Sequence, residues 1–348
     1  MTREYCTYFD HRYAARGIAM IRSLRRHAPS ARVFVLCLDD QVRSLLQKLD
    51  EPGVVLVSIG EFERDDPALS AAREDGRSRM EYYFTCSPSL IRYVMHAAPD
   101  AEWVTYLDGD LWFFSPPDCI YQELADASVG IVAHRYPSGH EAKNKYGIYN
   151  VGWVSFRRTP AGLACLDWWR ERCLEWCLDT VDEANDRFAD QRYLNRFSVL
   201  FSGVHAIANA GVNLAPWNIA GHRLALADGH VTVDGTRLVF FHFHGLKRAS
   251  RRLFLTSHGQ YGAGVDRATR EGIYKPYLRE ILEVESIVTP LMPAPASESI
   301  RMGASREGSG RARLRKLRDL ARSTKAFLRG LTVWMPRPSQ ATDRRVSR

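Results

Sequence analysis

The sequence lacks any long apolar run. No stretch of about 18 or more apolar residues occurs, which is the length that a membrane-spanning helix requires. The first four residues lead directly into a strand-like segment at residues 5–9, without the apolar region of a secretory signal peptide. We therefore expect neither a spanning helix nor export, and we place the protein in the cytoplasm.

Cysteine is scarce and irregularly spaced. The chain has seven cysteines in 348 residues, an odd number, and no C-x-x-C pair. Most of them lie within apolar runs, and Cys173 and Cys177 share one face of an expected helix. This pattern is typical of reduced, buried thiols in a cytosolic protein rather than of a disulfide framework.

Most of the chain lacks a net positive charge. The formal net charge is +8, yet residues 301–348 hold 14 Lys and Arg against three acids, so residues 1–300 carry −3. A mildly acidic body does not suit a nucleic-acid channel, and we expect no nucleic-acid partner. Electrostatic attraction is instead expected from the C-terminal tail.

Short β-branched segments alternate with helical patterns over the first hundred residues. The expected order is strand 5–9, helix 14–26, strand 33–38, helix 41–49 and strand 54–59. This order predicts a parallel sheet covered by helices. After a polar stretch at 65–79, a helix is expected to begin near Ser87, which can cap it, with Pro88 in its first turn.

The second half of the body predicts mixed or antiparallel additions to this sheet. The expected elements are strand 103–107, strands 129–134 and 149–156 around a loop at 135–147, helices 162–177, 190–197 and 268–283, and a hairpin that turns at Asp234 and Gly235. We expect a body at 1–289, a Pro/Ser/Gly linker at 290–310, a basic amphipathic helix at 311–335 and a disordered tail at 336–348.

Two acids separated by one glycine follow the strand expected at 103–107. Alternate side chains of an extended chain share a face, so Asp108 and Asp110 can reach one ion. Ligands of open α/β sheets bind beyond the carboxyl ends of the strands, and two hard oxygens suit Mg²⁺ or Mn²⁺. An Asp-Gly-Asp segment is also an ordinary turn, so this motif alone leaves both interpretations open.

Two histidines end the last expected strand. Imidazole is a suitable third ligand for Mn²⁺, and His242 and His244 would share a face, with Lys247 and Arg248 close enough to hold a phosphate. Histidines in an apolar strand are also commonly packed residues. Their combination with Asp108 and Asp110 favours a metal site.

Five segments together resemble a known family. They are Thr7 to Asp10 followed by an Arg-containing helix, the Tyr-Leu-Asp-Gly-Asp segment at 106–110, Tyr-Asn-Val-Gly at 149–152, Asp190 and Gln191 with Leu194 and Asn195, and His242-x-x-Gly245. In this order they resemble the GT-A type sugar-nucleotide glycosyltransferases, especially the glycogenin and bacterial lipooligosaccharide galactosyltransferase group. The resemblance covers about residues 3–280 and implies a GT-A, Rossmann-like fold with a mixed central sheet and helices on both faces.

The resemblance also implies roles by position. Thr7, Phe9 and Asp10 would border the base and ribose of a nucleotide sugar. Asp108, Asp110 and His242 would hold Mn²⁺ or Mg²⁺ on its diphosphate, and Lys247 would neutralise the leaving diphosphate. Arg92 would reach the donor sugar and Asp108, while Asn150, Asp190 and Gln191 would line the donor sugar.

Each implied role has a simpler structural alternative. Arg92 can be an exposed helix charge, Asp190 can favour a helix dipole, and Asn150 can be a turn residue. Trp217 can stack on a sugar or pack in a loop. The family continues its histidine motif with Pro-Trp, which is absent here, so whether Lys247 or Arg248 contacts phosphate stays open.

The segment expected to form the tail helix places apolar residues three and four apart, with Lys and Arg between them. Such a helix at 311–335 can lie on an anionic membrane surface, bind a partner helix, or stay solvated.

The expected function is metal-dependent transfer of a sugar from a nucleotide-diphosphate donor, with UDP as the first choice, to a glycan or lipid-linked acceptor at the inner membrane face. Retention of the anomeric configuration is implied by the resemblance only. The alternatives are a nucleotidyltransferase, a nucleotide-sugar hydrolase, and a noncatalytic membrane-associated adaptor.

Overall fold

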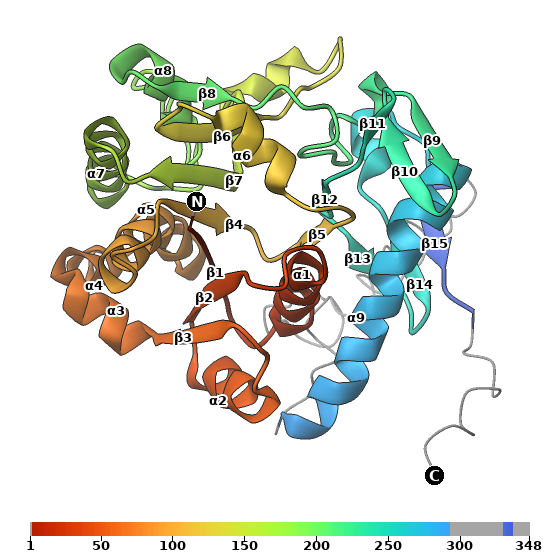
Figure 1. Cartoon of the computed structure of the whole chain (residues 1–348), viewed down its shortest axis with the longest axis horizontal. Helices are drawn as coiled ribbons and strands as arrows, with labels where there is room; N and C mark the ends of the chain where they lie inside the picture. Colours follow the sequence, from red (N-terminus) through yellow and green to blue (C-terminus); the bar gives the residue numbers. More distant parts are fainter. Residues whose placement is uncertain (1, 293–329, 337–348) are drawn as a thin grey trace, which may run out of the picture.

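The β-branched segments of the first half form one side of a central sheet. In the computed structural model, which describes residues 2–292 and 330–336, seven strands lie in the order β3-β2-β1-β4-β7-β6-β8 (Figure 1). The four strands at one side are parallel: β1 (Arg3–Phe9), β2 (Arg32–Cys37), β3 (Val54–Ser58) and β4 (Trp103–Leu107). The predicted βαβαβ unit is confirmed.

The other side of the sheet is mixed, as predicted. Strand β7 (Tyr149–Arg157) runs antiparallel to β4 and to β6 (Val129–Ala133), and β8 (Val204–Ala206) pairs in parallel with β6. Parallel pairing stops at β4, which pairs antiparallel with β7 on its other side and ends at Leu107, directly before Asp108. The strand order reverses between β1 and β4, and a reversal of this kind opens a crevice at the carboxyl ends of the strands.

Helices cover both faces of the sheet, because alternate residues of each strand point to opposite sides. One apolar core holds Tyr5 and Phe9 of β1 with residues of α1 (Ala14–His27), α2 (Asp40–Leu49) and α6 (Asp118–Leu124). The other holds Cys6 with residues of α3 (Ile59–Asp65), α4 (Pro67–Glu74), α5 (Arg79–Ala97), α7 (Pro160–Glu175) and α8 (Phe197–Leu200). All seven cysteines are free thiols and all but Cys119 are buried.

Helix α5 begins earlier than predicted. Its N-cap is Ser78, whose hydroxyl accepts from the amide of Glu81, while the Glu81 carboxylate accepts from the amide of Ser78. Pro88 lies inside the helix and Ser87 is buried there, so the expected start near Ser87 was wrong. The reciprocal cap at Ser78 stabilises the earlier start, and the polar stretch expected at 65–79 contains α4.

A second group of strands forms against the first sheet. Strand β12 (Phe240–His242) pairs antiparallel with β5 (Leu111–Phe113), and β9 (Leu224–Ala227), β10 (His230–Val233) and β11 (Thr236–Arg237) form a small sheet. The predicted hairpin turns where expected, with φ of 51° at Asp234 and 85° at Gly235. Its second strand is short, because the chain then leaves to pair with β5.

Several short helical turns and one long helix complete the body. The turns are η1 (Glu141–Tyr146), η2 (Arg192–Arg196), η3 (Ile219–Gly221), η4 (His258–Tyr261), η5 (Ala268–Tyr274) and η6 (Thr289–Leu291). The helix expected at 190–197 is therefore η2 followed by α8, and the helix expected at 268–283 is η5 followed by α9 (Lys275–Val288). Helix α9 packs against α1.

The end of the predicted tail helix is a strand. Strand β15 (Thr332–Trp334) pairs with β14 (Leu253–Leu255), which pairs with β13 (Lys247–Arg248). Val333 and Met335 are buried, whereas Trp334 is 57% exposed, which is the two-residue alternation of a strand. A helix that continues to residue 335 is therefore wrong. The rest of that helix at 311–329, most of the linker and the tail at 337–348 lie outside the described residues.

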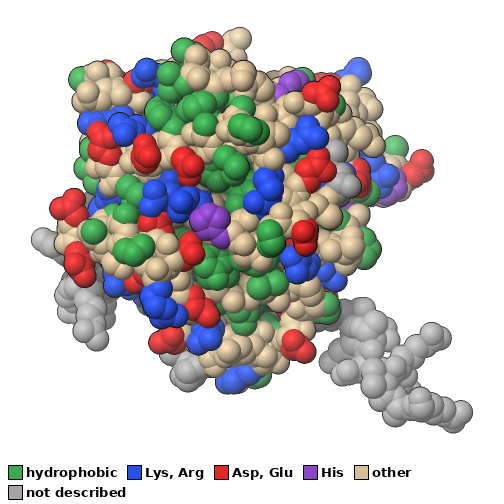
Figure 2. All heavy atoms as spheres, turned by 60° about the vertical axis from the view of Figure 1, so that its left-hand side comes forward, with side chains coloured by type: hydrophobic (Ala, Val, Ile, Leu, Met, Phe, Trp, Pro, Cys, Tyr) green, Lys and Arg blue, Asp and Glu red, His purple; other side chains and the backbone are tan. Residues whose placement is uncertain are grey.

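The surface of the body mixes charges of both signs. Figure 2 shows acidic and basic side chains interspersed over one face, with apolar groups between them. Among the described residues, no helix combines the length and the apolar character that crossing a membrane requires.

Candidate functional site

Asp108 and Asp110 lie where β4 ends and the chain turns into β5. The amide of Asp108 donates to the carbonyl of Gly152 at 3.1 Å, and the amide of Leu111 donates to the carbonyl of Asp108 at 3.3 Å. His242 is opposite Leu111 in the β5–β12 pair. This pairing brings a residue from far along the chain next to the two acids.

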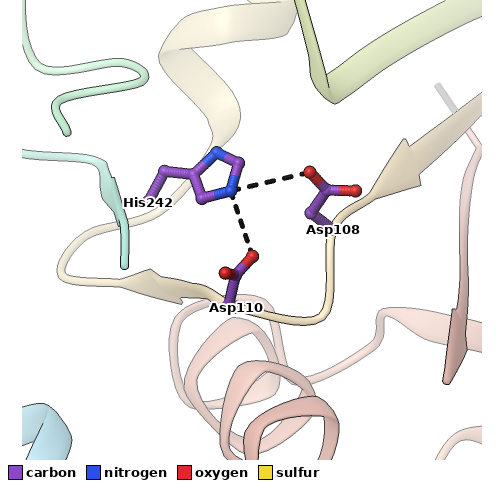
Figure 3. Close-up of side chains that lie close together, drawn as sticks. All are labelled: Asp108, Asp110 and His242. Atoms are coloured by element: carbon purple, nitrogen blue, oxygen red, sulfur yellow. Dashed lines mark ion pairs between the residues drawn. The ribbon is translucent and has the colours of Figure 1, made fainter. Parts of the chain in front are cut away.

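The three side chains converge on one point (Figure 3). The Nε2 atom of His242 is 3.0 Å from Oδ1 of Asp110 and 3.6 Å from Oδ2 of Asp108. Ligand atoms of all three lie within 4.8 Å of one another. His242 and Asp110 are buried, while the side chain of Asp108 is 31% exposed. The fold therefore brings together the three side chains that the sequence predicted to meet.

Gly152 leaves the space that His242 occupies. A Cβ atom at position 152 would come within 2.8 Å of Nδ1 of His242 and 2.6 Å of Oδ1 of Asn150. The Nδ1 atom is buried and has no hydrogen-bond partner within the described part of the chain, where the imidazole is held by packing and by its Nε2 contacts. Two carboxylates and one imidazole nitrogen are donors that Mn²⁺ and Mg²⁺ sites use, and this set fits such an ion.

The electrostatics of the two acids differ. Burial alone would raise the pKa of Asp110, but His242 and Arg16 outweigh it and hold this pKa below its usual range. Burial raises the pKa of Asp108, with Asp110 adding to the effect and His242 opposing it. The pKa of His242 is raised, because Asp110 and Asp108 overcome the effect of burial. Asp110 is therefore the more firmly ionised acid.

Asp190 lies close enough to Asp108 for the charge of one to affect the other. It is 4% exposed, and burial raises its pKa to about 7, with Asp108 adding to the effect and the Ser87 hydroxyl opposing it. Its backbone carbonyl accepts from the indole of Trp169 at 2.8 Å. The hydroxyl of Tyr8 lies 3.3 Å from that of Ser87, and the hydroxyl of Tyr106 donates to Asp108 at 2.9 Å.

Asn150 and Gln191 form one polar unit beside the acids. The Asn150 amide nitrogen donates to Gln191 Oε1 at 3.1 Å, and the Gln191 amide nitrogen donates to the carbonyl of Tyr146 at 2.8 Å. Oδ1 of Asn150 accepts from the amide of Gly152 at 3.1 Å. The structure thus connects both residues to the strand that borders Asp108.

The end of β1 differs from the expectation. Thr7 is fully buried and Phe9 is 2% exposed in the apolar core, so only their backbone can border a ligand. The reason is strand alternation, which directs Tyr8 toward the site and its neighbours away from it. Asp10 is partly exposed, and its carboxylate accepts from the amides of Arg12 and Tyr13 at the start of α1.

Arg92 is directed away from the acids. Its Nε donates to Asp167 of α7 at 3.1 Å, and no ion pair or hydrogen bond in the described part of the chain joins it to Asp108. The contact expected between Arg92 and Asp108 is therefore not present. Ser87, one and a half turns earlier on α5, faces the site instead.

The two cations after the histidine motif have different surroundings. Arg248 donates to Glu285 of α9 at 2.6 Å and lies over the ring of Phe254. Lys247 is exposed and has no ion pair among residues 2–292 and 330–336. Of the pair left open by the sequence, Lys247 is the one available to a phosphate.

Trp217 packs rather than stands free. It is 3% exposed, and its ring lies 4.9 Å from that of His242 and 5.5 Å from that of His244, measured between centroids. It therefore supports the histidine instead of offering an open stacking surface.

Sequence reasoning missed four contributors to the site: Tyr8, Tyr13, Arg16 and Ser87. The alternation of β1 could have selected Tyr8, and the three-residue spacing of Tyr13 and Arg16 places them on one face of the entry to α1. Nothing local indicates that this face meets Asp110. The buried position of Ser87 became predictable only once the true start of α5 was known.

Two curated proteins of Bacillus subtilis (strain 168) are similar to the chain. It is 34% identical to YfnF over 258 residues, which cover 72% of this chain and 84% of YfnF, and 32% identical to YfnD over 290 residues, which cover 82% and 92%. Both are described as uncharacterized proteins. No family model matches the sequence.

Among solved structures, the chain is similar to the bifunctional glycosyltransferase WbbM in its apo form. The TM-score is 0.50 at 14% identity, covering 84% of this chain and 52% of WbbM. It is also similar to the galactosyltransferase LgtC in complex with donor and acceptor sugar analogs, with a TM-score of 0.48 at 17% identity, covering 85% of this chain and 98% of LgtC. The likeness to WbbM concerns the fold, which is of the GT-A type that the motifs predict.

Proposed function

Because the chain belongs to the family of YfnF and YfnD and has a GT-A fold, we propose that it is a metal-dependent glycosyltransferase. It moves a sugar from a nucleotide-diphosphate donor to a glycan or lipid-linked acceptor. The fold is shared with WbbM, a bifunctional glycosyltransferase, and this likeness supports the reaction class. UDP is the first nucleotide to test.

The observation that carries the proposal is the meeting of Asp108, Asp110 and His242 at the end of β4. This point lies at the carboxyl end of the parallel strands, where α/β sheets bind nucleotides. A bound divalent cation would offset the charge that develops on the departing diphosphate. We propose that Lys247, exposed at the start of β13, holds a phosphate oxygen.

The polar groups beside Asp108 suit a sugar. Asn150, Gln191 and Asp190 present an amide pair and a carboxyl that near neutrality is partly protonated. We propose that they bind the donor sugar and orient its C1 carbon. A nucleophilic carboxylate must be ionised, and the raised pKa of Asp190 makes it a weaker candidate for that role.

A front-face reaction needs no such nucleophile. In it, the acceptor hydroxyl oxygen bonds to C1 on the face from which the diphosphate oxygen departs, and the hydroxyl proton passes to the leaving phosphate. The anomeric configuration is then retained. Asp190 and Gln191 would serve in positioning the sugar during this exchange.

The experiment is a calorimetric and thermal-shift screen of UDP-, GDP- and dTDP-sugars with and without Mn²⁺. One class of nucleotide sugar is expected to bind only when Mn²⁺ is present. In Asp110→Asn, this Mn²⁺-dependent binding is expected to be lost. Asp100→Asn, an exposed acid near the opposite end of β4, is the matched control. Binding that ignores Mn²⁺ would contradict the metal assignment.

Product analysis separates the alternative functions. A nucleotidyltransferase releases pyrophosphate, and a hydrolase cleaves the donor at a rate that no acceptor increases. A noncatalytic adaptor binds no nucleotide in a metal-dependent way. Release of nucleoside diphosphate together with a glycosylated acceptor is the result that the proposal requires.

We further propose that the basic segment at 311–329 attaches the enzyme to the anionic cytoplasmic face of a membrane, where a lipid-linked acceptor would be available. Its support is the excess of cations in this part of the sequence, each worth about 1 kcal/mol near such a surface. Truncation before the linker would also remove β15, so substitution is the better test. The cations to replace by Gln are Arg313, Arg315, Lys316, Arg318, Arg322, Lys325 and Arg329.

The full chain is expected to sediment with anionic vesicles more than with neutral ones, and salt should weaken this binding. The Gln variant should lose the preference while binding donor normally. If it sediments equally well, the segment is not the anchor, and a partner helix or a solvated tail becomes the better account.

A further inference from the structure

Arg16 is a buried arginine on α1 with partners in two distant parts of the chain. It is 5% exposed, so its charge must be compensated within the protein. Nη1 donates to the hydroxyl of Tyr13 at 2.8 Å, and Nη2 donates to the carbonyl of Leu246 at 2.6 Å. Nη1 also lies 3.8 Å from Oδ2 of Asp110.

These contacts determine the direction of the next hydrogen bond. An arginine nitrogen can only donate, so the Tyr13 oxygen accepts from Arg16 and its proton points elsewhere. That hydroxyl donates to Oδ2 of Asp110 at 3.0 Å. Oδ2 is therefore occupied, and Oδ1 is left facing Nε2 of His242. Arg16 thus orients, through Tyr13, the carboxylate oxygen that faces the proposed ion.

The second contact of Arg16 holds the loop after His242. Leu246 lies between Gly245, whose φ is 69°, and Lys247. A Cβ at Gly245 would come within 2.9 Å of the Ser257 side chain, so this turn is closely packed on one side. In the same turn, the carbonyl of Leu246 accepts a hydrogen bond from Arg16.

We propose that Arg16 is a positioning residue that connects the metal-facing carboxylate of Asp110 to the turn that directly precedes Lys247. One rigid guanidinium then sets both the ion ligand and the phosphate-binding cation relative to α1, where a lysine would reach only one partner. The inference rests on the proposed function for its purpose, while the tether itself is a property of the free protein.

Tyr277 of α9 supplies a matched control. Its ring stacks on Phe243 with centroids 3.7 Å apart, and its hydroxyl is buried near Arg16 and Asp110 with no hydrogen-bond partner among residues 2–292 and 330–336. Tyr277→Phe therefore removes an oxygen from the same surroundings and breaks no hydrogen bond of the tether. If the substitutions at Arg16 and Tyr13 act by loosening this core in general, Tyr277→Phe should change the same measurements. If they act by breaking the tether, Tyr277→Phe should behave like the wild type.

The first measurement is amide hydrogen exchange of residues 243–248 in the full chain without nucleotide. Arg16→Met is expected to speed exchange about tenfold in this segment, because the loop opens more readily once its anchor is lost. Tyr13→Phe and Tyr277→Phe retain the Arg16–Leu246 contact and should exchange like the wild type. Arg16→Lys, which keeps the charge, should fall between them and serves if Arg16→Met does not fold.

The second measurement is Mn²⁺ affinity, read from the electron paramagnetic resonance signal of the free ion. Tyr13→Phe changes no charge but releases Oδ2 of Asp110, and affinity should fall about 10-fold or more, as for other outer partners of metal ligands. Tyr277→Phe should bind Mn²⁺ like the wild type. If Arg16→Met leaves loop exchange unchanged, or if Tyr277→Phe changes both readouts equally, the proposal is overturned.

The two readouts also separate this inference from the proposed function. Failure of wild-type protein to bind Mn²⁺ would count against the metal-dependent transferase and against the carboxylate half of the inference. Hydrogen exchange of residues 243–248 would still test whether Arg16 holds this loop. Where a donor is found, the tether further requires that Arg16→Lys lower kcat while KM for the donor changes little.

Discussion

Two buried carboxylates of one site have opposite electrostatic surroundings. Asp110 is 7% exposed and Asp190 is 4% exposed, so burial penalises their charged forms in similar measure. Asp110 has Arg16, His242 and the Tyr13 hydroxyl beside it, and its pKa is held low. Asp190 has Ser87 and the like charge of Asp108, and its pKa rises to about 7. Partners, rather than depth, decide which acid keeps its charge.

This difference suits two tasks within one reaction. A permanently ionised acid with one oxygen free can attract a cation and a diphosphate. An acid that holds a proton near neutrality can donate a hydrogen bond to an oxygen of an uncharged sugar. The proposed glycosyltransferase needs both.

The largest effect expected from this difference between Asp110 and Asp190 is at Asp110. Asp110→Asn is expected to lower turnover about 10³-fold, because stabilisation by a metal ion is worth several kcal/mol. Metal-dependent donor binding should disappear while the circular dichroism spectrum stays unchanged. Steady-state kinetics beside Asp100→Asn measures this, and near-normal turnover would remove Asp110 from the metal site.

On the sugar side, smaller kinetic losses are expected. Asp190→Asn and Gln191→Ala should lower kcat and kcat/KM together by about 10²-fold, the loss typical of one positioned polar contact. Affinity for free UDP should change much less, because UDP has no donor sugar. Calorimetry with UDP alone checks the distinction, and equal loss of UDP binding would place these residues elsewhere.

Variants of His242 and His244 test which histidine binds the metal ion. His242→Ala should weaken Mn²⁺ binding about 10-fold or more, since it removes a nitrogen 3.0 Å from Asp110. His244→Ala should do less, because His244 is exposed and belongs to no group of potential metal ligands found among the described residues. Manganese titration of both variants ranks them. The reverse order would mean that the wrong histidine was chosen.

The last prediction concerns stability rather than activity. A pKa raised from 3.8 to about 7 means that Asp190 costs no stability in acid and increasingly destabilises the fold as pH rises between these values. Asp190→Asn should therefore be more stable than the wild type at pH 8, by a few kcal/mol, and the gap should narrow toward pH 5.

Thermal unfolding at both pH values, with chelator present, measures the gap. Asp100→Asn serves again as the control, because its exposed carboxyl should give no such trend. A gap that does not depend on pH would show that Asp190 is charged in the folded protein.

Much of the fold and part of the site follow from the sequence alone. The alternation of strands and helices, the mixed sheet and the meeting of Asp108, Asp110 and His242 were all predicted correctly. Strand and helix periods are local properties, and the Asp-Gly-Asp and His-x-x-Gly segments mark the ends of strands. These local features require no knowledge of distant contacts, whereas the meeting of His242 with the two acids was predicted from the combination of motifs and from the family resemblance.

The errors share a cause. Thr7 and Phe9 were expected at a ligand, but β1 directs them into the core. Arg92 was expected at Asp108, but the packing of α5 on α7 pairs it with Asp167. The segment ending at residue 335 was expected to be helical, yet pairing with β14 makes Thr332–Trp334 a strand. In each case, the direction in which a side chain points in the folded protein, or the partner that its segment meets there, decided the outcome against the resemblance or the periodicity.

The sequence by itself therefore determined the elements, the fold class and the chemical character of the site. Only the tertiary structure decided which acid is charged, because Arg16 reaches Asp110 and Leu246 through the packing of α1 on segments about 100 and 230 residues away. Local periodicity governs how a segment folds. Which side chains then meet depends on how complete elements pack, and that sets the burial and the charges from which this site is built.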